Sequence, residues 1–319
     1  MAEITESGLV EVFDRVQALV HKTPVLTSRL LDEMAGSTLF FKCENFQRMG
    51  AFKMRGATNA VQRLSKEQLK KGVLTHSSGN FAQALSLAAK QAGAKAYIVM
   101  PDSAPMVKRS AVRSYGGEII LCESTIEARE RKCRQIEIET GATFIHPSDN
   151  LDVIYGNATA TIELLQEQPD LEIVITPVGG GGLIAGTALA VHFFGKSCIT
   201  IGAEPAIADD AYRSFISGKI ETNVNVNGNQ TVADGLRTNL GKHNFPIIRK
   251  YVNQIIRVEE AEILSALRLI YERLKIVVEP SSAVALAAVL NSPQVFKGKK
   301  TGVILSGGNI DLREILKRF

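Results

Sequence analysis

Short apolar runs alternate with longer Ala-rich stretches along most of this chain. The apolar runs are rich in β-branched residues, as the buried strands of parallel sheets are. They fall at residues 39–43, 73–76, 96–100, 118–121, 143–146, 173–178, 199–203 and 301–305. The stretches between them, for example residues 82–90, have a helix-forming composition. This alternation predicts an α/β fold in which mostly parallel sheets are flanked by helices.

Four consecutive glycines, residues 179–182, come directly after the apolar run at 173–178 and before an Ala- and Leu-rich stretch. A strand that ends in glycines at a helix start exposes several backbone N–H groups, and the helix dipole favours negative charge there. The glycines therefore predict an anion site, most often one for a phosphate. Polar residues also follow two other predicted strands, at 77–80 and 306–309. Because ligands bind at the carboxyl ends of parallel strands, we expect one polar pocket there.

Composition narrows the class of protein. The 319 residues are 45% hydrophobic and 22% charged, with a net charge of +4, which allows an ample core and predicts two lobes. Basic and acidic residues are interspersed, so nucleic-acid binding is disfavoured. No apolar stretch is long enough to span a bilayer, and the first residues lack the regions of a signal peptide, so we expect a cytoplasmic protein. The four cysteines show no metal-type spacing and are expected to be reduced core residues.

Lys53 is a candidate for covalent attachment of a phosphorylated cofactor. The chain has no Gly-x-x-x-x-Gly-Lys-Ser/Thr motif and no early Gly-x-Gly-x-x-Gly followed by an acid, so nucleotide and dinucleotide sites are disfavoured. Lys53 lies beside Phe52 and two residues before Arg55. An apolar wall and a neighbouring cation lower the pKa of an amine, as a Schiff-base lysine requires. The spacing alone does not distinguish Lys53 from a solvated surface lysine.

The segment Gly-Ala-Phe-Lys-Met-Arg-Gly-Ala at 50–57 resembles the Ser-Phe-Lys-x-Arg-Gly-Ala motif of fold-type II pyridoxal-phosphate enzymes, specifically the serine racemase and serine/threonine dehydratase family. The resemblance runs almost end to end, through the segments at 21–26, 42–47, 77–80, 179–182, 203–205, 278–280 and 305–309. It implies a fold similar to the tryptophan synthase β chain, with two lobes that each contain a mostly parallel sheet. It also implies a large cofactor-binding domain of residues 1–65 and 151–319 and a small domain of residues 66–150.

The resemblance implies how pyridoxal phosphate is held. Lys53 would form the Schiff base and move the Cα proton on one face of the substrate, Asn80 would face the ring hydroxyl, and Ser306 would bond the pyridine nitrogen. The implied cofactor-binding residues are Phe52, Lys53, Asn80, Gly179, Gly180, Gly181, Gly182, Glu279 and Ser306. A neutral serine at the nitrogen makes a weaker electron sink than a carboxylate does. That favours expulsion of a β-leaving group over a long-lived carbanion.

These assignments imply a dehydratase that converts L-serine, L-threonine or similar β-hydroxy amino acids into a 2-oxo acid and ammonia. Ser78 leaves racemisation open, because the matching serine of the racemases is the acid/base on the face opposite the lysine, and racemisation needs two such groups. Its alternative role is to bind the substrate carboxylate together with Ser77 and Asn80. Arg129 matches an arginine that helps to hold the substrate carboxylate in the racemases, or it is a solvated charge on a helix.

Departures from the family pattern concern the substrate. Phe81 stands where the family usually has a histidine, which removes a hydrogen-bond donor and adds apolar bulk beside the substrate. Asn157 replaces a glutamine and Ala51 a serine, while Ser148 and Asp149 lie in a loop that borders the β-substituent by this resemblance. The alternatives are therefore a racemase of serine or aspartate, a 3-hydroxyaspartate dehydratase, and a non-catalytic homologue that binds the cofactor or an amino acid.

Glu204, Ala208 and Asp210 resemble the divalent-metal site of the family. Two carboxylates six residues apart, with a carbonyl between them, supply the hard oxygen ligands that suit magnesium, manganese or calcium. Acids near a helix start are also common dipole partners or caps, and spacing alone favours that role.

As partners we expect an amino-acid substrate and a second copy in a homodimer, with ATP or another nucleotide effector left open. The polar segment at 223–230 predicts a surface loop.

Overall fold

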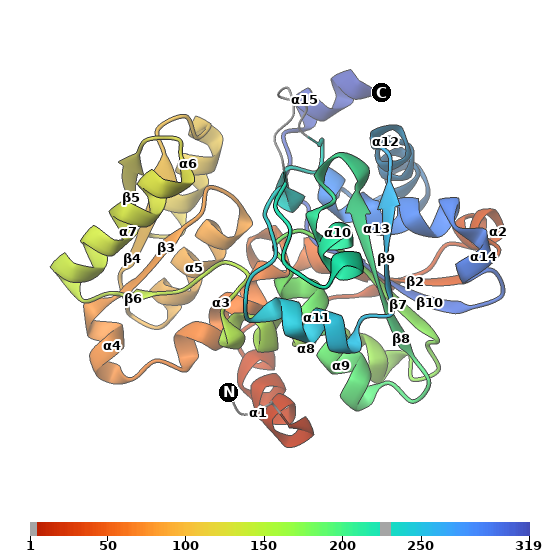
Figure 1. Ribbon diagram of the computed structural model, residues 1–319, viewed down its shortest axis with the longest axis horizontal. Helices are drawn as coiled ribbons and strands as arrows, with labels where there is room; N and C mark the ends of the chain where they lie inside the picture. Colours follow the sequence, from red (N-terminus) through yellow and green to blue (C-terminus); the bar gives the residue numbers. More distant parts are fainter. Residues whose placement is uncertain (1–4, 224–230) are drawn as a thin grey trace.

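The strands of the protein form two separate sheets with helices packed around and between them (Figure 1). The computed structural model describes residues 5–223 and 231–319. Apart from Asn223, the loop predicted at 223–230 lies outside the described residues. Both sheets are mostly parallel and are flanked by helices, so the predicted fold class is confirmed.

The larger sheet has six strands in the order β1-β2-β10-β7-β8-β9. They are β1 (Val25–Leu26), β2 (Thr38–Cys43), β7 (Ile173–Pro177), β8 (Ile199–Pro205), β9 (Gln254–Val258) and β10 (Lys300–Leu305). Among them only β1 runs antiparallel to its neighbour. The helices α12 (Glu260–Leu269) and α13 (Pro280–Asn291) cover one face, while α8 (Leu151–Glu167) and α9 (Gly182–Phe194) cover the other. Because both faces are covered, the central strands are mostly apolar and almost completely buried.

The smaller sheet has four parallel strands in the order β5-β4-β3-β6. They are β3 (Val73–His76), β4 (Ala96–Pro101), β5 (Gly117–Cys122) and β6 (Thr143–Phe144). The helices α5 (Asn80–Gln91) and α6 (Met106–Ser114) lie on one face, and α7 (Ile126–Thr140) lies on the other. These four strands fall within the small domain that the sequence predicts, but the domain boundaries themselves stay a prediction.

Helix α3 (Lys53–Gln62) links the two parts, because it packs against α5 beside the smaller sheet and against α8 beside the larger one. Its crossing with α8 is close. A Cβ at Gly56 would lie 2.5 Å from Asn157 Oδ1, and one at Gly156 would lie 2.6 Å from the carbonyl oxygen of Arg55. Glycine is therefore needed at both positions. Lys53, the first residue of α3, is thereby held between the two sheets.

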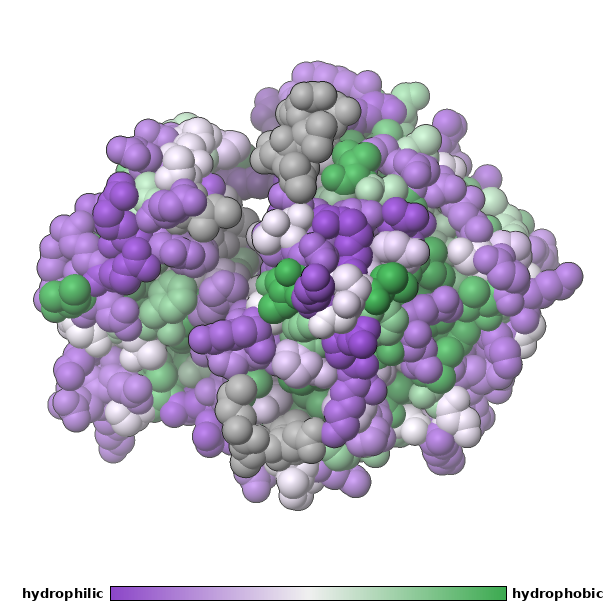
Figure 2. All heavy atoms as spheres, in the orientation of Figure 1, coloured by the Kyte–Doolittle hydropathy of each residue, from purple (hydrophilic) through white to green (hydrophobic). Residues whose placement is uncertain are grey.

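The remaining α-helices lie around this frame. They are α1 (Glu6–Gln17), α2 (Arg29–Ala35), α4 (Lys66–Lys71), α10 (Asp210–Ser217), α11 (Asn244–Tyr251), α14 (Pro293–Phe296) and α15 (Leu312–Ile315). The face drawn in Figure 2 is mostly hydrophilic, with apolar residues scattered over it. None of the helices in the described part of the chain is long and apolar enough to cross a membrane.

All eight apolar runs singled out in the sequence are strands, with small differences at their ends. Their carboxyl ends bring together the polar segments that the sequence places there. His76 ends β3, the glycines follow β7, and Ser306 follows β10. The structure therefore offers a site between the two sheets, where ligands of α/β folds bind.

Candidate active site

The Lys53 amine lies in an apolar setting. The side chain is half-buried, and Nζ lies 5.0 Å from the ring centre of Phe52 and 5.8 Å from that of Phe81. Nζ donates a hydrogen bond of 2.9 Å to the carbonyl oxygen of Pro147. Desolvation lowers the pKa of the amine to about 8, although the charge of Glu279 acts in the opposite direction. About a tenth of the amine is therefore neutral, and nucleophilic, at pH 7, far more than for an ordinary lysine.

The four glycines form the turn between β7 and α9. Gly181 has a φ of 82°, and Gly182 is the first residue of α9. The first N–H groups of a helix have no partner within it. A Cβ at Gly180 would lie 2.5 Å from Ser148 Oγ, and one at Gly182 would lie 2.8 Å from the carbonyl oxygen of Ser148. The absence of side chains thus lets the loop pack against Ser148 and leaves backbone donors at a helix start, which is the arrangement that binds phosphate.

Contacts that sequence reasoning missed hold this loop in place. Asn244, at the start of α11, donates from Nδ2 to the carbonyl oxygens of Gly180 (2.8 Å) and Ser148 (3.2 Å). The Asp149 carboxylate accepts hydrogen bonds from the backbone N–H groups of His243 (2.8 Å) and Asn244 (3.0 Å). The loop after β6 and the start of α11 therefore clamp the glycines from two sides.

Ser306 lies at the end of β10 with its hydroxyl beside Ser282. The two Oγ atoms are 3.2 Å apart, and Ser282 donates its own proton to the carbonyl oxygen of Gly307 at 2.7 Å. Since the Ser282 proton is used, Ser306 is the donor in the contact between the two hydroxyls, and a ligand atom that accepts from Ser306 would replace Ser282 Oγ as its acceptor. The carbonyl oxygen of Ser306 accepts from the backbone N–H of Phe52 at 3.0 Å, which ties β10 to the start of α3.

Asn80 and Glu279 contact each other across the two parts of the molecule. Asn80 Nδ2 donates to both carboxylate oxygens of Glu279, at 3.0 and 3.1 Å. Burial raises the pKa of Glu279 to about 7, although the Asn80 hydrogen bond opposes this shift. Asn80 and Glu279 thus join the start of α5 to the start of α13, on the side of the site where Lys53 and Ser306 lie. Whether Glu279 also contacts the cofactor stays a prediction.

The substrate-side residues predicted from the sequence come from β3, α5 and α7. Ser77 and Ser78 are half-buried in the loop after β3, whereas Phe81 is buried and faces the Lys53 amine. Arg129 is half-buried on α7, and its Nε is buried without a hydrogen-bond partner among the described residues. No ion pair neutralises Arg129 in the described part of the chain, so it is available to an anionic group.

Two histidines beside these residues were not identified from the sequence. The rings of His76 and His146 are 5.6 Å apart; His76 ends β3, and His146 lies two residues after the neighbouring strand β6. His146 Nδ1 accepts from the backbone N–H groups of Ser148 (3.3 Å) and Asp149 (2.9 Å). The ring proton of a neutral His146 is therefore on Nε2. Burial, followed by the charge of His76, lowers the pKa of His146 to about 4. His146 is therefore neutral at physiological pH.

The predicted metal ligands Glu204 and Asp210 are both buried and lie close enough to affect each other. Burial is the main cause that raises the pKa of each carboxyl, to about 7 for Asp210. Glu204 also accepts from the N–H groups of Ala211 (3.0 Å) and Tyr212 (2.8 Å) and so caps α10. Two buried carboxylates without a cation suit a divalent ion. However, the described residues contain no group of three or more His, Cys, Asp or Glu side chains that would hold one.

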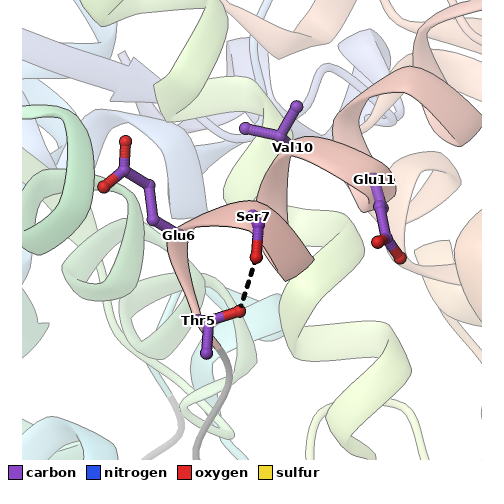
Figure 3. A pocket seen from close by; sticks show the side chains of 5 residues that line it. All are labelled: Thr5, Glu6, Ser7, Val10 and Glu11. Atoms are coloured by element: carbon purple, nitrogen blue, oxygen red, sulfur yellow. Dashed lines mark hydrogen bonds between the residues drawn. The ribbon is translucent and has the colours of Figure 1, made fainter.

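A surface hollow beside α1 lies outside this site. It is lined by Thr5, Glu6, Ser7, Val10 and Glu11 (Figure 3). These side chains all come from the start of one helix, and the hydroxyls of Thr5 and Ser7 bond to each other. The hollow is a shallow feature of the surface of α1 and takes no part in the arrangement around Lys53.

The fold and the site together define a class of α/β enzyme that anchors a phosphorylated cofactor through a lysine. Residues 16–307 match the family described as "Pyridoxal-phosphate dependent enzyme", and the chain belongs to this family. The glycine turn and the partly neutral Lys53 amine fit such a cofactor. They would supply backbone donors for its phosphate and a nucleophile for its aldehyde.

Known relatives agree with this assignment. The chain is 47% identical to the serine racemase of Dictyostelium discoideum, over 99% of this chain and 98% of the relative. It is 44% identical to the beta-hydroxyaspartate dehydratase of Paracoccus denitrificans, over 98% of each chain. The solved structure of maize serine racemase superimposes with a TM-score of 0.94 at 42% identity, covering 99% of this chain and 97% of that chain. The protein is thus a fold-type II pyridoxal-phosphate enzyme with dehydratase or racemase activity.

Proposed function

We propose that the protein dehydrates L-serine, L-threonine or similar β-hydroxy amino acids to 2-oxo acids and ammonia, and that it also racemises serine. The observation that carries this proposal is the Lys53 amine, which is partly neutral, is shielded by Phe52 and Phe81, and contacts the loop that packs against the glycine turn. The neutral Ser306 hydroxyl at the end of β10 supports β-elimination, because no carboxylate takes its place.

The residues of the chain divide the proton transfers between them. Pyridoxal phosphate, when bound, supplies the electron withdrawal that weakens the Cα–H bond of the amino acid. Lys53 Nζ removes the Cα proton from one face and passes it to the β-hydroxyl, which leaves as water. One water then hydrolyses the released enamine, so that the net products are a 2-oxo acid and ammonia. For racemisation, Ser78 Oγ returns a proton to Cα from the opposite face.

A second candidate substrate is 3-hydroxyaspartate. Two observations favour it: the half-buried Arg129 has no anionic partner in the described residues, and a relative 44% identical is a beta-hydroxyaspartate dehydratase. A second carboxylate on the substrate would be drawn to such a cation. Aspartate racemisation would use the same contact, with no β-leaving group to expel.

The deciding experiment incubates the protein with the L and D forms of serine, threonine and aspartate, and with the isomers of 3-hydroxyaspartate. Chromatography measures the enantiomers and the 2-oxo acids. We expect 2-oxo acid from L-serine and L-threonine, with D-serine formed in parallel, and neither from Lys53→Ala. In Ser78→Ala we expect D-serine formation to fall by more than about tenfold. D-serine production that survives this substitution would refute the two-base assignment, and turnover of 3-hydroxyaspartate alone would select the second candidate.

We also propose three properties that concern the whole protein. Glu204, the Ala208 carbonyl and Asp210 bind magnesium, manganese or calcium as a structural ion, and the protein works in the cytoplasm as a homodimer. The two buried carboxylates support the metal, because they accept hydrogen bonds but form no salt bridge among the described residues. A rise in melting temperature on addition of the ion, which Glu204→Gln should remove, tests the site. Size-exclusion chromatography tests the dimer, and turnover with and without ATP tests a nucleotide effector.

A further inference from the structure

Asn309 connects three parts of the site that are distant in the sequence. Its Nδ2 donates to the carbonyl oxygen of Met49 at 2.8 Å and to Asn80 Oδ1 at 2.9 Å. Its backbone N–H also interacts with the Glu279 carboxylate. Asn309 lies shortly after Ser306, so it joins the end of β10 to the start of α5 and to the turn before α3.

These contacts determine how the Asn80 amide is oriented. A backbone carbonyl only accepts hydrogen bonds, so the nitrogen of Asn309 must face Met49. The same nitrogen faces Asn80, which therefore presents its oxygen to Asn309 and its nitrogen to Glu279. The oxygen of Asn80 is occupied, and one of its two N–H groups serves Glu279. The second N–H remains for a ligand, and the oxygen, although it has a second lone pair, is directed at Asn309, so Asn80 presents a donor to the ligand.

The contact with Met49 holds a strained turn. Met49 has a φ of 54° and a ψ of 14°, and Gly50 has a φ of 77°. A left-handed conformation at a residue other than glycine is costly and persists only where the surroundings fix it. A Cβ at Gly50 would lie 2.7 Å from Asn309 Oδ1, so glycine is also what allows Asn309 to approach. Lys53 follows shortly after this turn.

We propose that Asn309 is a positioning residue that orients the Asn80 amide as a donor toward the cofactor ring and holds the Met49 turn that leads into Lys53. The proposal rests on the proposed role of Asn80 and Lys53 at the cofactor. It explains why a left-handed methionine lies so close before the anchoring lysine. The strained conformation of Met49 is maintained because the Asn309 side chain bonds both the Met49 carbonyl and the Asn80 amide.

Asn309→Asp tests the proposal, because it keeps the size of the side chain but removes both donated hydrogen bonds. We expect the dissociation constant for pyridoxal phosphate, measured by fluorescence, to rise about tenfold, as expected for the loss of two neutral hydrogen bonds. We also expect the pH midpoint of the visible absorbance of the bound cofactor to move. The matched control is Asn45→Asp, since Asn45 Nδ2 donates to the Val277 carbonyl (3.1 Å) and makes no hydrogen bond to Asn80 among the described residues. It should leave affinity and midpoint unchanged.

A double substitution separates positioning from general stability. In an Asn80→Ala background, Asn309→Asp should no longer move the absorbance midpoint, because the amide through which it acts is gone. Asn309→Ser serves in its place if Asn309→Asp does not fold. Equal affinity and equal spectra for Asn309→Asp, Asn45→Asp and the unaltered protein would overturn the proposal. If the unaltered protein takes up no pyridoxal phosphate, the proposed function fails instead.

Discussion

Two opposing effects set the pKa of the Lys53 amine. Desolvation lowers its pKa from 10.5 to about 8, and the charge of Glu279 limits the shift. The rings of Phe52 and Phe81 lie beside the amine and keep water from it. Phe81 thus takes part in the setting of the amine, at a position where a histidine would place a polar nitrogen. The apolar substitution noted in the sequence acts on the lysine as well as on the substrate.

The rate at which the apoprotein captures pyridoxal phosphate should follow this pKa. Only the neutral amine attacks the aldehyde, and its fraction rises with pH through the pKa and then levels off. We therefore expect the capture rate, followed by visible absorbance across the alkaline range, to rise with a midpoint near 8 and not near 10.5. Phe81→Asn, which admits water, should move the midpoint upward, while Phe81→Leu should leave it in place. A midpoint close to 10.5 in the unaltered apoprotein would contradict the argument.

The residues that hold the site were less accessible to sequence analysis than those expected to act in it. Lys53 and the glycines lie in motifs that can be read locally. Asn244 contacts Gly180 from 64 positions away, and Asn309 contacts Asn80 from 229. An isolated asparagine has no local pattern that indicates such a partner, because turns and caps use the same residue. The supporting contacts follow from the packing of α11 and β10 and become visible only in the fold.

At the scale of elements, the glycine turn depends on both backbone conformation and space. Gly181 and Gly298 have nearly equal φ values, 82° and 77°. A Cβ at Gly181 would lie 2.7 Å from Asn244 Oδ1 and from Leu240, whereas one at Gly298 would meet no atom within 4 Å. An alanine at either position has the same backbone strain, but only the alanine at 181 also collides with its neighbours. Comparing the two substitutions therefore distinguishes the effect of strain from the effect of crowding.

Gly181→Ala should therefore weaken cofactor binding, and Gly298→Ala should not. Each substitution should lower stability by about 1 kcal/mol through the left-handed backbone. In Gly181→Ala the added methyl also displaces Asn244 from the turn, so we expect the dissociation constant for pyridoxal phosphate to rise about tenfold or more. Equilibrium dialysis measures the affinity, and the melting temperature of each apoprotein measures the shared strain. Equal affinities for the two variants would show that the turn tolerates the crowding.

The strands illustrate what periodicity can and cannot predict. Buried strands such as β7 are continuous apolar runs and were identified nearly to their ends. The missed strands, β1 and β9, lie at the two edges of the larger sheet, where β1 has two residues and β9 has only two buried residues. β6 ends at Phe144, earlier than predicted, and the N–H groups of Ser148 and Asp149 turn back to the ring of His146. Edge strands have fewer buried positions and therefore a weaker pattern.

At the scale of the whole molecule, a buried cluster of four charges joins the elements behind Lys53. Arg55 of α3 bonds Glu44 and Glu163, each at 2.7 Å, and Lys42 of β2 bonds Glu163 at 2.7 Å. All four side chains are almost completely buried. Two positive and two negative charges balance, so the cluster is neutral as a unit. Such a group is stable only while it is complete, because each member would be costly to bury alone.

Glu163→Gln should therefore destabilise the protein by about 3 kcal/mol, since it leaves two buried cations with one carboxylate. Glu272→Gln, in the exposed pair with Arg268, is the control and should change little. Chemical unfolding measures the stability of the two variants.

Burial alone would raise the pKa of Glu163, yet Arg55 and Lys42 lower it below 4.5. A carboxyl whose pKa is lowered by folding stabilises the folded state at pH values above its pKa in the unfolded state. This stabilisation is lost as the pH falls through its pKa in the folded state. The difference between Glu163→Gln and the unaltered protein should therefore shrink as pH falls below 4.5. A difference that stays constant down to the acid transition would show that Glu163 contributes shape and not charge.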